Sequence, residues 1–182
     1  MRVIDLVIGF GWAAFWLYWL AASTGVKTGR VRWGQFAGFR VAVVLLVLLL
    51  LRLRVLKGHD VTRDPVLQGI GLALFLAGLA LAVWARVYLG RNWGMPMTQK
   101  DDPELVTAGP YHVIRHPIYS GIILAMIGTA IAVSVYWLIA VVVVGGYFIF
   151  SATREERYMS ERFPDTYPGY RRSTKMLVPF LL

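Results

Sequence analysis

The segment GPYHVIRHPIYSG, residues 109–121, combines an arginine and a histidine with a proline that favours a helix start. Proline suits the first residue of a helix because it lacks an N–H that would stay unpaired there and its φ is already helical. We therefore expect a helix to begin at Pro117, with free backbone N–H groups facing the space beside Arg115 and His116. Such a site suits an anion, for example the carboxylate of an amino-acid-like cofactor. The alternative is an ordinary helix entry with an arginine and a histidine at an apolar–polar boundary.

The pair Glu155-Glu156 follows an apolar stretch and has Arg154 before it and Arg162 after it. Negative charge is unfavourable at the C-terminal end of a helix, so helix stability does not explain the pair. We expect the two carboxylates to form a polar wall that orients a cofactor or a substrate. Arg154 is expected to hold a substrate carboxylate with its planar fork, and Arg162 is a second candidate for this role. The alternative is solvated pairing of the glutamates with neighbouring arginines.

The composition is that of a chain that lies largely in lipid. Hydrophobic residues make up 58% of the 182 residues and charged residues 16%, below the roughly 25% typical of a soluble domain. The net charge of +9 is distributed between apolar stretches, so we interpret the basic residues as topology signals rather than a nucleic-acid surface. The chain has no cysteine, which excludes disulfides and thiolate chemistry, and its three histidines do not suggest a metal site.

Five apolar stretches qualify as membrane helices, since a hydrocarbon core about 30 Å thick needs about 20 residues of helix. They cover residues 3–22, 39–56, 66–89, 118–133 and 136–153. The alternative for the first is a cleaved signal peptide. We predict an all-α polytopic membrane protein with about five transmembrane helices, the last two in a tight hairpin, and a cytosolic C-terminal tail. The whole chain, 1–182, would form one integral membrane domain, with two N-terminal spans in 1–64 and the functional core in 65–182.

The tight hairpin returns its two open ends to one face of the membrane, so Arg115 and Glu155 are expected to become neighbours. Most basic residues fall on that face. Because positive charge favours the cytoplasmic side, the loop from Gly90 to His116 and the tail are predicted to be cytoplasmic. Small residues also recur at near-helical spacing on the fourth stretch, and they predict close packing against a helix or contact with a flat ligand. They are Gly121, Ala125, Gly128 and Ala132.

Taken together, these residues resemble a known family. The pattern begins with LVTAGPY, residues 105–111, and continues with Arg115-His116-Pro117-x-Tyr119-x-Gly121. An apolar hairpin comes next, and after it the pair Glu155-Glu156. The pattern ends in the tail with Phe163, Tyr167 and Tyr170. In this pattern the chain resembles the isoprenylcysteine carboxyl methyltransferase family and is similar to the related membrane phospholipid methyltransferases. The resemblance covers about residues 88–180, including GRNW at 90–93, but not the first two spans. The tail departs from it, with Phe163-Pro164-Asp165 where many members have Phe-Gly.

The resemblance implies a membrane methyltransferase that uses S-adenosylmethionine and takes a lipophilic acceptor from the bilayer, with membrane lipids as partners and neither nucleic acid nor metal. By position, it assigns the cofactor to Tyr111, Arg115, His116, Pro117, Tyr119, Gly121 and Glu155. It implies that Glu155 and Glu156 contact the cofactor or position substrate, and that Arg154, or else Arg162, faces the acceptor. The expected acceptor is a prenylcysteine-like or other lipophilic carboxylate. A lipid amine, a small thiol or another acceptor is the alternative, and a non-catalytic membrane protein with the same hairpin is a second alternative.

Overall fold

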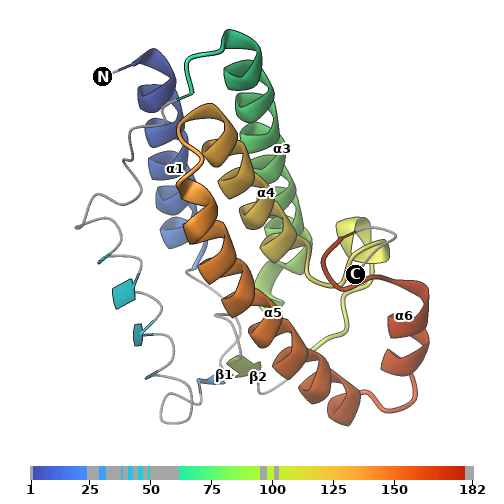
Figure 1. The fold of residues 1–182 in the computed structure, drawn as a ribbon. Helices are drawn as coiled ribbons and strands as arrows, with labels where there is room; N and C mark the ends of the chain where they lie inside the picture. The colour runs from blue at the N-terminus through green and yellow to red at the C-terminus, as the bar shows by residue number, and fades with distance from the viewer. Residues whose placement is uncertain are drawn as a thin grey trace.

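The computed structural model describes residues 2–23, 29–31, 62–94, 98–100 and 103–178, together with isolated positions between 38 and 49. Long apolar helices stand side by side in this part of the chain (Figure 1). They are α1 (Val3–Ala22), α3 (Pro65–Leu89), α4 (Pro117–Ala132) and α5 (Trp137–Arg162). The shorter helices are α6 (Tyr167–Ser173) and the 3-10 turns η2 (Gly90–Asn92) and η3 (Gly109–His112). The predicted all-α polytopic fold is confirmed.

The helix bounds agree closely with three of the predicted spans. α1 and α3 are long and apolar enough to cross a membrane, and α4, at 16 residues, is a shorter apolar helix. The predicted span at 39–56 lies outside the described residues apart from isolated positions. The prediction of a last span ending at 153 is wrong, because α5 continues to Arg162. The residues after 153 continue the helix, and Glu156 is paired there with cations from other segments.

Two short strands were not predicted. β1 (Gly29–Val31) pairs in antiparallel register with β2 (Thr98–Lys100), so the segment after α1 lies beside the loop after α3. Strands of three residues are too short to show the alternation by which a strand is recognised in a sequence.

Local signals fix the helix ends around the site. The Asp64 carboxylate accepts hydrogen bonds from the backbone N–H groups of the first turn of α3, and Pro65 is the first residue of that helix. α3 ends at Leu89, and the next residue, Gly90, has a φ of 52°, in the left-handed region that glycine adopts without strain. Pro117 begins α4, as the sequence predicts.

Glycines bring α3 and α4 into backbone contact. A Cβ atom at Gly78 would lie 2.4 Å from the backbone N of Ala125, and one at Gly121 would lie 2.6 Å from the carbonyl oxygen of Gly78. Neither position has room for a side chain. The small face of α4 is therefore a helix-packing surface, one of the two roles that its spacing predicts.

Different segments of the chain meet at the two ends of the helix bundle. At one end, the Arg2 guanidinium donates hydrogen bonds to the carbonyl oxygens of Thr62, at 2.5 Å, and Val133, at 3.3 Å. The start of α1, the segment before α3 and the α4–α5 turn thus meet there, as the order of spans predicts. The open ends of α4 and α5 lie at the other end, together with α6 (Figure 1).

Candidate functional site

The segment that leads into α4 is held by the C-terminal tail. The backbone N–H of Arg115 donates to the carbonyl oxygen of Lys175 at 2.8 Å, and that of His116 donates to Met176 at 3.0 Å. In return, the N–H of Lys175 donates to Val113 at 3.2 Å. The backbone amides of Arg115 and His116 are therefore paired with the tail. Their pairing fixes the Arg115 and His116 side chains toward α5.

Glu156 is the buried centre of an ion-pair network. Its Oε1 lies 2.7 Å from Nε of Arg115, its Oε2 lies 3.3 Å from Nε of Arg171, and the residue is 3% exposed. Arg115 also donates to the carbonyl oxygens of Arg171, at 3.1 Å, and Thr174. One guanidinium thus ties the start of α4 to α5 and to the tail.

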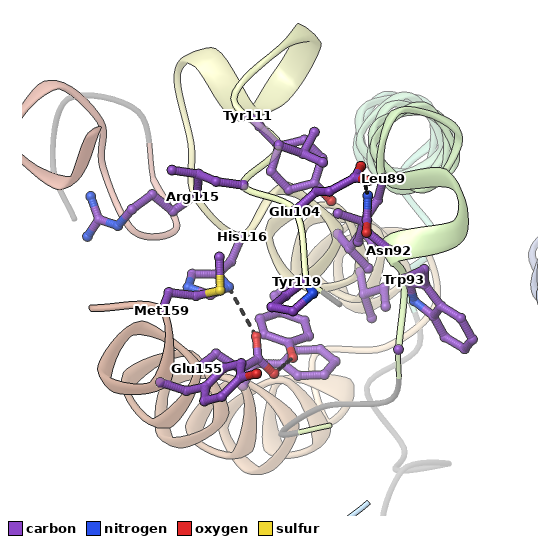
Figure 2. A pocket seen from close by; sticks show the side chains of 18 of the residues that line it. Leu89, Asn92, Trp93, Glu104, Tyr111, Arg115, His116, Tyr119, Glu155 and Met159 are labelled. Carbon is purple, nitrogen blue, oxygen red and sulfur yellow. Dashed lines mark hydrogen bonds and ion pairs between the residues drawn. The ribbon is translucent and has the colours of Figure 1, made fainter. Parts of the chain in front are cut away.

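His116 lies between the two carboxylates. Its Nδ1 is 3.5 Å from Oε2 of Glu155, and its Nε2 is 3.5 Å from Oε1 of Glu156. The hydroxyl of Tyr119 donates to Oε1 of Glu155 at 2.6 Å, and the rings of His116 and Tyr119 are stacked with centroids 5.5 Å apart. Figure 2 shows the imidazole of His116 directed at Glu155 across the pocket wall. The two polar clusters therefore lie next to each other, as the hairpin predicts.

The charge state of His116 follows from two opposed effects. Burial lowers the pKa of this imidazole, but hydrogen bonding to Glu155 and Glu156 and their charges raise it by more, so its pKa lies above its ordinary value. Burial also raises the pKa of Tyr170 to about 12 and the pKa of Tyr111 above its usual range. These phenols stay neutral near pH 7 and donate hydrogen bonds, as Tyr170 does to the carbonyl oxygen of Tyr111 at 2.6 Å.

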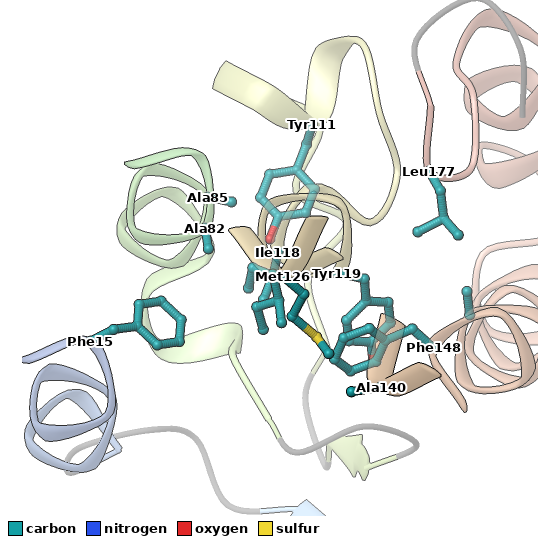
Figure 3. Close-up of a cluster of buried hydrophobic side chains, with 12 residues drawn as sticks. Phe15, Ala82, Ala85, Tyr111, Ile118, Tyr119, Met126, Ala140, Phe148 and Leu177 are labelled. Atoms are coloured by element: carbon teal, nitrogen blue, oxygen red, sulfur yellow. The ribbon is translucent and has the colours of Figure 1, made fainter. Parts of the chain in front are cut away.

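A cavity of about 620 Å³ opens beside this network, within the range of roughly 300–1,000 Å³ usual for small-molecule sites. Its polar wall comes from residues near the two clusters: Tyr111, Arg115, His116, Tyr119, Glu155, Tyr158, Tyr167 and Tyr170. Its apolar wall includes Trp16, Trp19, Leu20, Leu89, Trp93, Ile118, Ile122 and Phe148. Tyr119 and Phe148 stack with centroids 4.4 Å apart and join the cavity to the hydrophobic core (Figure 3). The cavity thus combines a cluster of polar side chains with a largely apolar lining.

Two buried polar atoms belong to residues that line this cavity. The Oδ1 of Asn92 and the Nε2 of His116 have no hydrogen-bond partner among the described residues. The Nδ2 of Asn92 donates to Oε2 of Glu104 at 3.0 Å, which orients the amide. The Nε2 of His116 has the Glu156 carboxylate 3.5 Å away, whereas the Oδ1 of Asn92 fits a contact with a bound ligand, because buried polar atoms are normally paired.

The predicted site residues divide into three groups. Tyr111, Arg115, His116, Tyr119 and Glu155 line the cavity. Behind this wall are the buried residues Glu156, Pro117 and Gly121, the last of them against α3. Arg154 and Arg162 are exposed on α5 and are not among the residues that line the cavity. The guanidinium of Arg154 lies over the Phe150 ring, 5.2 Å from its centroid.

Sequence reasoning missed several contributors. Arg171 reaches Glu156 from α6, and Trp19 joins the cavity wall from α1. Trp93 and Asn92 were noticed only through their resemblance to GRNW in the family, without a role. Pairing with a distant carboxylate leaves no local pattern at Arg171. The recurrence of tryptophans in α1 is a signal that indicates packing but not its partner.

Comparisons with known proteins show what this chain is similar to. Residues 67–166 match a family described as Phospholipid methyltransferase. The chain is 28% identical over 119 residues to Protein-S-isoprenylcysteine O-methyltransferase B of Arabidopsis thaliana, covering 63% of this chain and 60% of that protein. It is 29% identical over 120 residues to Protein-S-isoprenylcysteine O-methyltransferase of Schizosaccharomyces pombe, covering 64% and 51%.

A further relative carries a different kind of name. The chain is 24% identical over 145 residues to the Nickel-cobalt-cadmium resistance protein NccN of Alcaligenes xylosoxydans xylosoxydans, covering 78% of this chain and 65% of that protein. The chain therefore spans between half and two thirds of the length of these relatives. The family match includes α4 and all of α5 with both glutamates, whereas α1 and α6 lie outside it.

Proposed function

Because this chain belongs to the phospholipid methyltransferase family, we propose that it transfers a methyl group from S-adenosylmethionine to a lipophilic acceptor at the membrane boundary. The observation that carries the proposal is the placement of His116 and Glu155 on the wall of a cavity whose lining is otherwise largely apolar. A polar cofactor and a greasy acceptor need a site of this mixed character.

The residues present fit the cofactor. Its amino-acid end carries a carboxylate, which suits the imidazole of His116, and the Oδ1 of Asn92 offers an acceptor to a donor group of either the cofactor or the acceptor molecule. Glu155 offers a negative charge to a positive ligand group, and Tyr119 orients that carboxylate. When bound, S-adenosylmethionine supplies a methyl group already activated by a positive sulfur. Glu156, Arg115 and Arg171 act as positioning residues, because they hold this wall from behind.

The protein's contribution to such a transfer is orientation and exclusion of water. Holding two reactants in line can supply about 7–11 kcal/mol of a barrier in favourable cases. A carboxylate acceptor is already nucleophilic at neutral pH, whereas an amine or hydroxyl acceptor needs a group that takes its proton. We infer a carboxylate acceptor, because it asks only for orientation and needs no general base from the site. The names of the Arabidopsis and Schizosaccharomyces relatives support the same class, a prenylcysteine-like carboxylate.

We also propose that the site faces the cytoplasm. The open ends of α4 and α5 lie on the side to which the sequence assigns most basic residues, and basic residues favour the cytoplasmic side. S-adenosylmethionine is made in that compartment.

Transfer from S-adenosylmethionine labelled in its methyl group tests the function directly. The detergent-purified full chain is incubated with N-acetyl-S-farnesylcysteine, with phosphatidylethanolamine, or with neither. We expect label in the farnesylcysteine as a base-labile methyl ester, and a strongly reduced rate in Glu155→Gln. Label in phosphatidylethanolamine alone would show that the acceptor is a lipid amine and not a carboxylate. Transfer to neither acceptor by a folded chain would contradict the proposal.

A further inference from the structure

Arg86 is a buried cation near the C-terminal end of α3, outside both polar clusters. The residue is 6% exposed. Its Nη1 donates to the carbonyl oxygen of Gly90 at 2.8 Å, and its Nη2 donates to the carbonyl oxygen of Ala22. Within the described part of the chain, it forms no ion pair with a carboxylate. A single side chain thus joins the last turns of α1 and α3.

A buried guanidinium without a carboxylate is an expensive way to join two helices. An apolar side chain would pack α1 against α3 at lower cost. What arginine adds is a rigid planar fork that fixes two carbonyl groups and an aromatic ring at once. The presence of Arg86 therefore indicates that the carbonyl groups and the aromatic ring it contacts must be held in a fixed arrangement.

The aromatic ring fixed in this way is that of Trp93. The Arg86 guanidinium lies over it, 4.8 Å from the ring centroid. Trp93 in turn meets Trp19 of α1 edge to face, with ring centroids 5.9 Å apart and an interplanar angle of 87°. Both tryptophans line the cavity, and Figure 2 places Trp93 on the side of the pocket away from Arg115 and His116. Arg86 is thus in direct contact with the part of the cavity wall that Trp93 and Trp19 form.

We propose that Arg86 is a positioning residue that holds Trp93 and Trp19 as the wall against which the apolar part of the acceptor binds. The inference rests on the proposed function. It goes further by assigning acceptor recognition in part to α1, which lies outside the segment that matches the family. Loss of Arg86 should release α1 and rotate the tryptophans, while the polar wall, built from α4, α5 and the tail, stays in place.

The test separates acceptor binding from cofactor binding in the full chain in detergent. In Arg86→Met, we expect the Kd and KM of N-acetyl-S-farnesylcysteine to rise about tenfold, with kcat changed much less. The Kd of S-adenosylhomocysteine should stay within about twofold of wild type. Arg86→Lys should recover only part of the acceptor affinity, because an ammonium group lacks the planar face that stacks on Trp93. The matched control is Arg91→Met, which removes an exposed arginine of η2 that is not a cavity residue and should change neither constant.

A double-mutant cycle excludes a merely structural role. If Arg86 acts through the ring of Trp93, Arg86→Met should add little to the rise in KM already caused by Trp93→Ala. Fully additive effects would overturn the proposal, as would equal losses of acceptor and S-adenosylhomocysteine affinity. Failure of wild type to bind the farnesylcysteine would also overturn the proposal. If wild type still bound S-adenosylhomocysteine in that case, the cofactor part of the proposed function would stand. If Arg86→Met does not fold, Trp19→Ala takes its place with the same expected split.

Discussion

Glu156 is the residue on which the cations of three segments converge. Arg115 and His116 approach it from the start of α4 and Arg171 from α6. The Arg115 and Glu156 side chains are 8% and 4% exposed, so their pairing is largely removed from water. The pair of Arg171 with Glu156 contributes little, since the Arg171 side chain is 59% exposed and water screens its charge.

Glu156→Gln should therefore destabilise the protein substantially. Removing one partner of a buried ion pair typically costs about 3–5 kcal/mol, because the other charge stays buried without compensation. We expect a clear fall in Tm in detergent. Glu161→Gln, on the exposed side of the same helix, should change the free energy of unfolding by no more than about 0.5 kcal/mol. Equal Tm values for the two variants would show that Arg115 does not depend on Glu156.

His116 should make stability depend on pH. Its pKa in the folded chain lies above the value of about 6.5 expected when unfolded, so folding favours its protonated form. Its contribution is then fully present below about pH 6.5 and is lost as pH rises through the folded pKa. The Tm difference between wild type and His116→Gln should shrink from pH 6 to pH 9. A difference that grows with pH would contradict the assigned charge state.

At the scale of single residues, the sequence predicted residues of the polar wall but not all of the residues that support that wall. Tyr111, His116 and Glu155 lie in recognisable motifs, and a tight hairpin had to bring them together. The prediction for Arg154 rested on its position next to Glu155. In the structure the Glu155 side chain lines the cavity, whereas the Arg154 side chain is exposed and lies over the Phe150 ring. Which of the two faces the cavity could not be predicted while the helix was expected to end near 153.

Among the helices, α3 and α4 depend most strongly on small residues. Gly78→Ala should destabilise the protein by about 1–3 kcal/mol, because the new methyl group would force the two backbones apart. Gly145→Ala is the matched control, since no atom of the described residues lies within 4 Å of a Cβ there. It should be neutral or stabilise α5 by up to about 1 kcal/mol through a better helix propensity. Thermal unfolding in detergent measures both. Equal tolerance of alanine at the two positions would refute backbone contact between α3 and α4.

The helix positions could be read from apolar length and from Pro117, Asp64 and Gly90, which mark ends by local chemistry. The continuation of α5 beyond residue 153 could not be predicted from the sequence. Its last turns are polar, and whether polar residues continue a helix or leave it depends on partners such as Arg115 that come from elsewhere in the chain. The pairing of β1 with β2 is unpredictable for the same reason.

For the molecule as a whole, the basic residues predict which side of the membrane each end occupies. A reporter fused after Leu182 should report a cytoplasmic location, and one inserted at Lys57 should not, because positive charge favours the cytoplasmic side. The same pair of fusions with the reporter active only outside the cytoplasm is the control and should give the opposite pattern. A cytoplasmic signal at Lys57 with none at Leu182 would reverse the orientation proposed for the site.

Binding of S-adenosylhomocysteine to the detergent-purified full chain, measured by calorimetry, tests most directly whether the cavity beside His116 and Glu155 is a cofactor site. Wild type should bind it saturably at one site. Glu155→Gln and His116→Gln should each weaken binding about ten- to hundredfold, the effect of losing a charged hydrogen bond of about 1.5–3 kcal/mol, while Glu161→Gln binds like wild type. No binding by folded wild type, or wild-type affinity in both cavity variants, would contradict the account.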